Sequence, residues 1–237
     1  MADLTGRVAI VTGGSEGIGR SVVEALAGEG ASVVLTSRSR DRATSVAGEI
    51  GGEVRGAVMG VGCDVRDPSQ CRDLVSATVA AFGGLDILVN NAGLGIFKPI
   101  QEMSAEEYLV QVETNLNGVF FTTKAALDPL READDAWVIN IGSLASRNTF
   151  SGGVGYNASK FGLLGMTEAM MLDLRYDGIR TSIIMPGSVN TGFSDHGDRP
   201  WAIQPDDVGE AVLQLLSYPR HTLVSRVEMR PSAPPRK

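Results

Sequence analysis

The chain has 237 residues, of which 43% are hydrophobic and 5% aromatic, and it contains 29 glycines. This length fits one α/β domain, expected over residues 1–237, and the composition excludes disordered and fibrous proteins. A net charge of −7 argues against nucleic acid as a partner, because phosphate binding needs clustered lysine and arginine side chains.

The cysteines and histidines do not have the spacing of a metal site. Cys63 and Cys71 form no CxxC pair, and His196 lies far from His221 in the chain. No apolar run is long enough to span a membrane, and the first residues lack a basic leader followed by an apolar stretch. We therefore expect a cytoplasmic protein that binds neither a metal nor a membrane.

Apolar β-branched runs alternate with segments of helical period along the whole chain. This pattern predicts an α/β fold of the Rossmann type, a doubly wound parallel sheet of about seven strands between two layers of helices. The expected strands are 7–12, 32–37, 57–63, 85–90, 137–141, 180–185 and 223–229. The expected helices are 17–27, 41–49, 68–83, 104–131, 156–175 and 204–217.

Local signals mark several of the expected helix ends. Pro68 and Gly83 suit the first and last positions of one helix. Ser104 with Glu107 forms a capping box at the start of the next helix, which we expect to be interrupted near Asn117.

The chain between the sixth strand and the last helix is short. Seventeen residues separate Gly187 from Pro205, so we expect a short substrate segment at about 188–204 and an open site. The Pro-rich, basic tail 231–237 is expected to be flexible. The candidate apolar walls of the site, each of which is otherwise a core residue, are Phe150, Phe193 and Trp201.

A glycine-rich loop, 12–19 (TGGSEGIG), stands between the first strand and its helix. Glycine lets the backbone turn sharply and come close to a pyrophosphate, and the helix N-terminus points free N–H groups at that anion. Inside a βαβ unit this loop predicts a nucleotide site. The loop residues expected to contact the nucleotide are Gly13, Ser15, Glu16, Gly17, Ile18 and Gly19.

The end of the second strand distinguishes NADP from NAD. An acidic residue there would bind the ribose 2′-hydroxyl of NAD and repel a 2′-phosphate, but this chain has Ser37 and Arg38. Arg38 can pair with a phosphate through two hydrogen bonds, and Ser37 can donate another. We therefore expect NADP(H), with NAD(H) as the alternative. Against NADP(H), Glu16 supplies no second positive contact, and the alternative for Arg38 is a solvated loop residue.

Tyr156 and Lys160 (YNASK) lie four residues apart, which places them on one face of the expected helix. A phenol with an ordinary pKa of about 10 is a poor acid or base at neutral pH, but a nearby ammonium lowers that pKa. The same spacing also occurs with a packed tyrosine ring and a solvated lysine. Ser143, after the fifth strand, can hydrogen-bond an oxygen that gains negative charge, although serine is also a common turn residue there.

These motifs together resemble the short-chain dehydrogenase/reductase family. The glycine loop has the TGxxxGIG form of that family, and Ser143, Tyr156 and Lys160 match its Ser–Tyr–Lys set. The resemblance covers essentially the whole chain through six ordered motifs. Asn90 is expected to support the sheet. The further cofactor contacts that the resemblance implies are Asp64, Val65, Asn91, Ala92, Gly93, Pro186, Gly187, Val189 and Thr191.

The resemblance implies an NADP(H)-dependent oxidoreductase that moves a hydride between the nicotinamide and a carbonyl or secondary alcohol carbon. It implies that Tyr156 exchanges the hydroxyl proton and that Ser143 orients the oxygen. Lys160 would hold the ribose and lower the pKa of Tyr156, and Asn115 would hold a water of a proton relay or else mark a helix kink. The alternatives are a 3-oxoacyl thioester reductase, a sugar or polyol dehydrogenase, and a catalytically silent NADP(H)-binding sensor.

The resemblance also implies that the substrate is a small-molecule carbonyl or alcohol. It further implies that the protein is a homodimer or homotetramer. The carboxyl end lacks the Gly-Gly ending of many relatives, which argues against a tetramer contact through the last strand. A dimer built on the helix that contains Tyr156 is consistent with the sequence.

Overall fold

The computed structural model describes residues 3–193 and 197–235. Within these residues seven strands form one parallel sheet in the order β3-β2-β1-β4-β5-β6-β7, which confirms the predicted doubly wound α/β fold. The strand order reverses between β1 and β4, and open α/β sheets bind ligands at such a point. The strands are β1 (Val8–Val11), β2 (Ser32–Ser37), β3 (Val58–Gly62), β4 (Ile87–Asn90), β5 (Ala136–Ile141), β6 (Ile179–Pro186) and β7 (Arg226–Met229).

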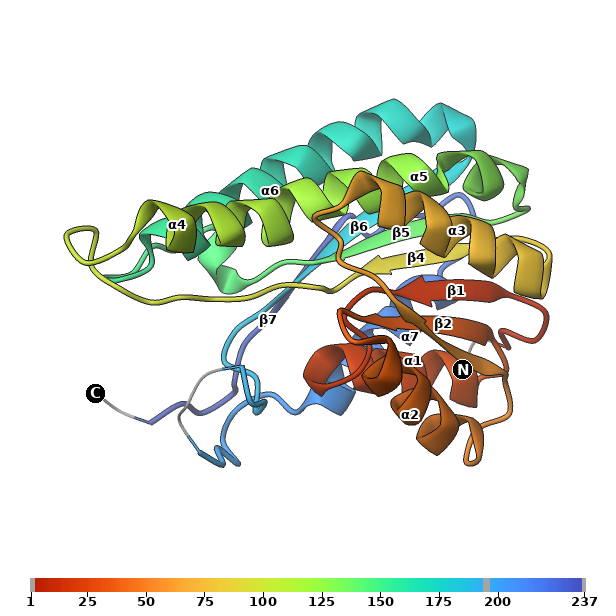
Figure 1. The fold of residues 1–237 in the computed structure, drawn as a ribbon, viewed down its shortest axis with the longest axis horizontal. Coiled ribbons are helices and arrows are strands. Elements are labelled where there is room, and N and C mark those ends of the chain that lie inside the picture. Colours follow the sequence, from red (N-terminus) through yellow and green to blue (C-terminus); the bar gives the residue numbers. More distant parts are fainter. Residues whose placement is uncertain (1–2, 194–196, 236–237) are drawn as a thin grey trace.

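Two layers of helices cover the sheet (Figure 1). One layer contains α1 (Gly17–Gly28), α2 (Arg40–Gly51) and α7 (Pro205–Ser217). The other contains α3 (Pro68–Phe82), α4 (Ala105–Val112), α5 (Gly118–Glu132) and α6 (Val154–Leu174). The interruption predicted near Asn117 is a π-helical segment, η1 (Glu113–Asn117), which joins α4 to α5. Short 3-10 segments are η2 (Leu144–Ser146) and η3 (Arg175–Asp177).

Side chains of the central strands alternate between the two faces of the sheet, as a pleated strand requires. Ala9 and Val11 of β1 lie in the core packed against α1, α2 and α7. Ile10, between them, lies in the core packed against α3 and α5. Both faces are therefore covered, which is why the central strands read as continuous apolar runs.

The helix ends lie where their sequence signals predict them, whereas the last strand begins later than predicted. Pro68 occupies the first turn of α3, and Gly83 ends that helix with a left-handed φ of 87°. Ser104 forms the predicted capping box of α4. Strand β7 begins at Arg226, three residues later than predicted, because it pairs with only the last four residues of β6.

A ladder of polar side chains is buried in the middle of the sheet. Asn90 of β4 donates from Nδ2 to Asn140 Oδ1 of β5 at 2.9 Å, and its Oδ1 accepts from the Thr122 hydroxyl of α5 at 2.6 Å. Asn140 donates in turn to the Thr167 hydroxyl of α6 at 2.9 Å. Buried polar groups are costly unless they are hydrogen-bonded, so the ladder fixes α5 and α6 over the sheet. Asn90 therefore supports the sheet, as expected.

The two ends of the segment between β6 and α7 are joined by a β-bridge between Val189 and Ile203.

No helix in the described part of the chain is long and apolar enough to cross a membrane. Two predicted regions reach outside the described residues: the substrate segment 188–204 at residues 194–196, and the tail 231–237 at residues 236–237.

Replacing Asn90 by Ala should lower the free energy of unfolding by about 2–3 kcal/mol, because Asn140 and Thr122 would each lose a buried hydrogen-bond partner. Urea unfolding followed by circular dichroism measures this loss. The control is Asn117→Ala, which changes an exposed asparagine and should cost less than about 0.5 kcal/mol. Equal losses in the two variants would contradict a supporting role for the ladder.

Candidate active site

A cavity of about 1040 Å³ opens beyond the carboxyl ends of the central strands. It is lined by the loops that follow β1 to β6 and by the first turns of α6. Parallel strands present their carboxyl ends at one edge of the sheet, so loops that are far apart in sequence meet there. Every predicted catalytic or cofactor-binding residue except Asn115 lines this cavity.

The glycine loop has the shape of a cradle. Gly13 and Gly17 adopt φ values of +63° and +52°, which side chains disfavour. A Cβ at Gly19 would lie 2.2 Å from the carbonyl oxygen of Gly13, so only glycine fits there. Glu16, the N-cap of α1, makes no side-chain cap hydrogen bond, which leaves the first N–H groups of the helix available to an anion. The loop therefore fits a pyrophosphate group.

Two other loops pack against this cradle. Asn91 Nδ2 donates to the carbonyl oxygens of Thr12 and Gly13, both at 3.0 Å. On the other side, Thr191 Cγ2 lies 3.3 Å from the place of a Cβ at Gly17. Asn91, expected to touch the cofactor, thus also holds the loop in place. The other predicted residues of these two loops line the cavity: Ala92, Gly93, Pro186, Gly187 and Val189.

The cavity extends past the end of β2 to the N-terminus of α2. Ser37 and Arg38 line it there, and Arg38 is exposed. Arg42, which the sequence analysis does not identify, lines the same region, and its Nη2 lies 2.6 Å from Glu16 Oε2. Its only signal in the sequence is its position four residues after Arg38. Arg42 thus places a second positive charge near Arg38, paired in this structure with Glu16.

Asp64 and Val65 line the cavity after β3. Arg66 Nε donates to both carboxylate oxygens of Asp64 at 3.0 Å. These hydrogen bonds hold the pKa of Asp64 below its ordinary value. The Asp64 carboxylate is therefore charged at neutral pH and accepts hydrogen bonds only.

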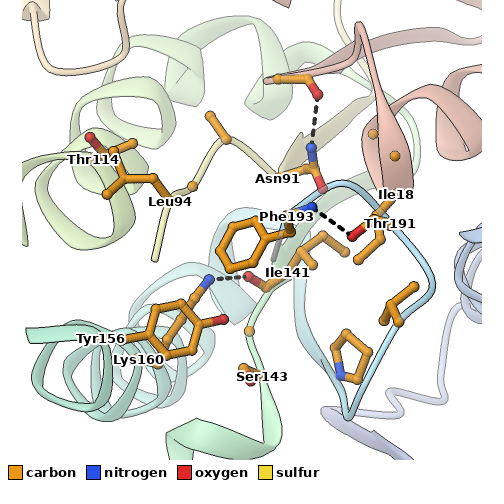
Figure 2. A pocket seen from close by; sticks show the side chains of 18 of the residues that line it. Ile18, Asn91, Leu94, Thr114, Ile141, Ser143, Tyr156, Lys160, Thr191 and Phe193 are labelled. Atoms are coloured by element: carbon orange, nitrogen blue, oxygen red, sulfur yellow. Dashed lines mark hydrogen bonds between the residues drawn. The ribbon is translucent and has the colours of Figure 1, made fainter. Parts of the chain in front are cut away.

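Three side chains meet at the other end of the cavity (Figure 2). Tyr156 and Lys160 lie one turn apart near the start of α6, and Ser143 follows β5. Lys160 Nζ is 5.8 Å from the centre of the Tyr156 ring and donates to the carbonyl oxygen of Ile141 at 2.9 Å. Both side chains are buried, and the Ser143 side chain lies close enough to the Tyr156 phenol to act on its pKa.

Burial controls the charge of the tyrosine and lysine. It raises the pKa of Tyr156 above its ordinary value, and the interaction with the Ser143 side chain opposes that shift. Burial also lowers the pKa of Lys160 from 10.5 to about 8. The pKa of Tyr156 is therefore raised and not lowered as expected, and the effect of Lys160 on that pKa stays a prediction. Loss of water is the largest cause of the upward shift, and the Lys160 ammonium is directed to the Ile141 backbone.

Asn115 lies behind the cavity wall, in η1, and is fully buried. Its Oδ1 accepts from the Leu94 N–H at 2.8 Å, and its Nδ2 donates to the Leu94 carbonyl at 2.8 Å and to Ser159 Oγ at 3.0 Å. The side chain thus holds the loop after β4 against α6. The π-helical turn is a local irregularity of the kind found at functional sites. The relay water stays a prediction.

Three phenyl rings line the cavity near Tyr156. Phe150 and Phe193 are among them, as expected, but Trp201 does not line the cavity. The third ring is Phe97, which the sequence analysis does not identify. It lies in a loop without periodic pattern, so no signal in the sequence places it at the site.

Residues 7–199 of the chain match the short chain dehydrogenase family. An uncharacterized oxidoreductase of Staphylococcus saprophyticus is 34% identical over 235 residues, which cover 98% of this chain and 100% of that protein. An uncharacterized oxidoreductase of Staphylococcus aureus is 32% identical over 234 residues, with coverage of 98% and 100%.

Solved structures are similar over the same length. An alcohol dehydrogenase from the archaeon Thermococcus sibiricus, complexed with 5-hydroxy-NADP, is 32% identical with a TM-score of 0.89 and coverage of 98% of this chain and 99% of that chain. A metagenomic short-chain oxidoreductase in complex with NADP is 33% identical with a TM-score of 0.86 and coverage of 98% and 100%. Because the family match spans most of the sequence and these relatives cover nearly all of it, the chain belongs to the short-chain dehydrogenase family.

Proposed function

We propose that the chain is an NADP(H)-dependent oxidoreductase that interconverts a carbonyl group and a secondary alcohol, with Tyr156 exchanging the proton. The observation that carries this proposal is that one cavity holds both the glycine cradle and the side chains of Ser143, Tyr156 and Lys160. The NADP in one similar solved structure and the 5-hydroxy-NADP in another support the same type of cofactor here. When bound, NADPH supplies a hydride to the carbonyl carbon.

In the direction of reduction, the hydroxyls of Ser143 and Tyr156 donate hydrogen bonds to the substrate oxygen, which gains negative charge as its carbon is reduced. Tyr156 then gives its proton to that oxygen, so the phenol O–H bond breaks and the alcohol O–H bond forms. The Lys160 ammonium, 5.8 Å from the ring centre, stabilises the phenolate that remains until solvent restores the proton.

Two arginines support NADP(H) over NAD(H). Arg38 is exposed at the end of β2, and Arg42 follows in the first turn of α2. A 2′-phosphate bound between them would replace Glu16 as the partner of Arg42. Glu16 thus competes with the phosphate, and Arg42 offsets its negative charge.

We also propose that the protein is a homodimer or homotetramer. Exposed apolar side chains lie on α5 and α6, the helices of one outer layer, and support self-association through these helices. They are Phe120, Phe161 and Leu172, with exposed fractions of 50%, 42% and 55%.

Replacing Tyr156 by Phe removes the proposed proton donor and keeps the packed ring. We expect kcat for carbonyl reduction to fall about 10²- to 10⁴-fold with little change in NADPH affinity. The absorbance of NADPH follows turnover, and its fluorescence measures affinity. The control is Tyr176→Phe, at a tyrosine that is 91% exposed. Near-full turnover by Tyr156→Phe would show that the assignment is wrong, and a wild type that binds NADPH but turns over no carbonyl or alcohol would favour the silent sensor.

Arg38→Asp should raise KM for NADPH about 10- to 100-fold and lower KM for NADH, because it replaces a charge-assisted hydrogen bond with repulsion. Arg42→Ala should raise KM for NADPH about 3- to 10-fold without changing KM for NADH. Glu16→Gln should lower KM for NADPH. Steady-state kinetics with both cofactors measure these changes. Arg20→Ala is the control, because Arg20 does not line the cavity. An unchanged cofactor preference in Arg38→Asp would contradict the assignment.

The depressed pKa of Lys160 predicts how stability changes with pH. This pKa is about 8 in the folded chain against an ordinary value of 10.5, so between these values the unfolded chain binds the proton and the folded chain does not. The contribution of Lys160 to stability therefore rises as the pH increases through this range. We expect the wild type to gain on the order of 2 kcal/mol relative to Lys160→Met between about pH 7.5 and about pH 10.

Urea unfolding of both proteins at each pH measures this gain. The control is Lys124→Met, at an exposed lysine of α5, which should show no such change relative to the wild type. A constant difference between the wild type and Lys160→Met across the range would contradict the shifted pKa.

A further inference from the structure

Three phenylalanines that line the cavity leave much of their side chains exposed. Phe97, Phe150 and Phe193 have exposed fractions of 44%, 47% and 46%. They come from three separate loops, which follow β4, η2 and β6. Contact of phenyl rings with water is unfavourable, and a group of such rings in a cavity marks a ligand site.

The three rings stand around the proposed proton donor. The centre of the Tyr156 ring lies 5.4 Å from that of Phe97, 6.0 Å from that of Phe193 and 6.5 Å from that of Phe150. Phe97 and Phe150 are 5.7 Å apart. Figure 2 shows Phe193 and Tyr156 beside the same space. We call these three phenylalanines the aromatic cage, and its walls adjoin the phenol that would meet the substrate.

Two glycines give the aromatic cage its shape. A Cβ at Gly95 would lie 2.6 Å from Cζ of Phe97 and 2.9 Å from Cε1 of Phe193. A Cβ at Gly153 would lie 2.8 Å from Cε2 of Phe150. Real Cβ atoms do not come so close to other atoms, so any other residue at these positions would displace the rings. The arrangement of the rings therefore depends on glycine at both positions.

Buried side chains hold the loop that carries Phe97. Gln111 Oε1 accepts from the Ile96 N–H at 3.0 Å, and Asn115 bonds both backbone groups of Leu94. Gln111 and Asn115 have no exposed surface. A loop held in this way offers its ring to a ligand without first losing conformational entropy.

We propose that the aromatic cage binds the ring of an aryl ketone or of the matching secondary aryl alcohol. This inference rests on the proposed function. A hydride passes from NADPH to the carbonyl carbon and the Tyr156 proton passes to its oxygen, so the ketone is reduced to the alcohol as NADPH is oxidised to NADP⁺. The substrate ring packs among the phenylalanines, and its carbonyl group points to Tyr156 and Ser143.

Polyhydroxylated substrates suit this cage poorly. Each hydroxyl of a sugar must keep a hydrogen bond when it leaves water, and the three walls are hydrocarbon rings without donors or acceptors. Asn148, a polar residue of the cavity lining, already donates from Nδ2 to the Leu144 carbonyl at 3.2 Å. The planes of the three phenylalanine rings are inclined by 53° to 76° to the plane of the Tyr156 ring. An aromatic substrate ring would instead gain favourable contacts with rings inclined in this way.

A substrate comparison with the whole protein and NADPH tests the proposal. We expect kcat/KM for acetophenone to exceed that for acetone and for D-xylose by at least about 100-fold. We expect it to exceed that for cyclohexyl methyl ketone about 3- to 10-fold, because only the aryl ring makes aromatic contacts. A preference for D-xylose or an acetoacetyl thioester would overturn the aryl assignment. If Tyr156→Phe abolished turnover of that preferred substrate, the proposed function would still stand.

Variants of the walls test the cage directly. Phe97→Ala and Phe193→Ala should each lower kcat/KM for acetophenone about 10- to 100-fold, but change that for acetone less than about threefold. Gly95→Ala, which displaces both rings without removing either, should act in the same direction. KM for NADPH should stay unchanged. The control is Tyr218→Ala, at a ring that is 42% exposed and does not line the cavity. Equal effects on acetophenone and acetone would overturn the proposal.

A binding measurement keeps the two proposals distinguishable. Saturation-transfer NMR with the NADP⁺-loaded protein should detect acetophenone, and Phe97→Ala should weaken its binding at least about fivefold. Binding that depends on Phe97 without turnover of any carbonyl would overturn the proposed function and keep the cage. Turnover of other carbonyls without acetophenone binding would overturn the cage and keep the function.

Discussion

The site depends on a hydrogen-bonded clamp between two loops at the carboxyl edge of the sheet. Asn91 Nδ2 donates to the carbonyl oxygens of Thr12 and Gly13, and the Thr12 hydroxyl accepts from the N–H groups of Asn91 and Ala92. The clamp joins the loop after β1 to the loop after β4, where the strand order reverses. The clamp also explains why position 19 needs glycine, because a Cβ there would lie 2.4 Å from Asn91 Nδ2. The start of α1 is thereby held facing the cavity.

Other buried amides fix the neighbouring loops in the same way. Asn90 joins the sheet to α5, and Asn115 holds the loop after β4. Asn157 Nδ2 donates to two backbone carbonyls of the loop after β5, at 2.8 and 3.0 Å. Because a buried amide that loses its partners is costly, each of these side chains strongly favours one arrangement of its loop. Hydride transfer requires reacting atoms to be held close and aligned, and fixed loops favour such alignment.

The sequence predicts those features that depend on neighbouring residues, and it misses those that depend on contacts between residues far apart in the chain. Strands, helix ends such as Pro68, and the glycine loop depend on residues close in sequence, and apart from the start of β7 their predicted positions agree with the structure. Arg42 and Phe97 acquire their places through contacts with Glu16 and Tyr156, far along the chain, which no local pattern reveals. The spacing of Tyr156 and a lysine shows that they share a helix face. It does not show how deeply both are buried, and that burial decides the direction of the pKa shift.

Burial of Tyr156 keeps the phenol in the form that the reductive direction of the proposed reaction needs. A phenol with an ordinary pKa of about 10 is protonated at neutral pH, and desolvation raises that pKa further, so Tyr156 can give a proton to a carbonyl oxygen. Lys160 keeps its charge below its pKa of about 8, with the Ile141 carbonyl as its partner. Oxidation of an alcohol requires the phenolate instead, and therefore a higher pH or further positive charge beside the ring. The burial that keeps water from the phenol thus extends to higher pH the range in which Tyr156 is a proton donor.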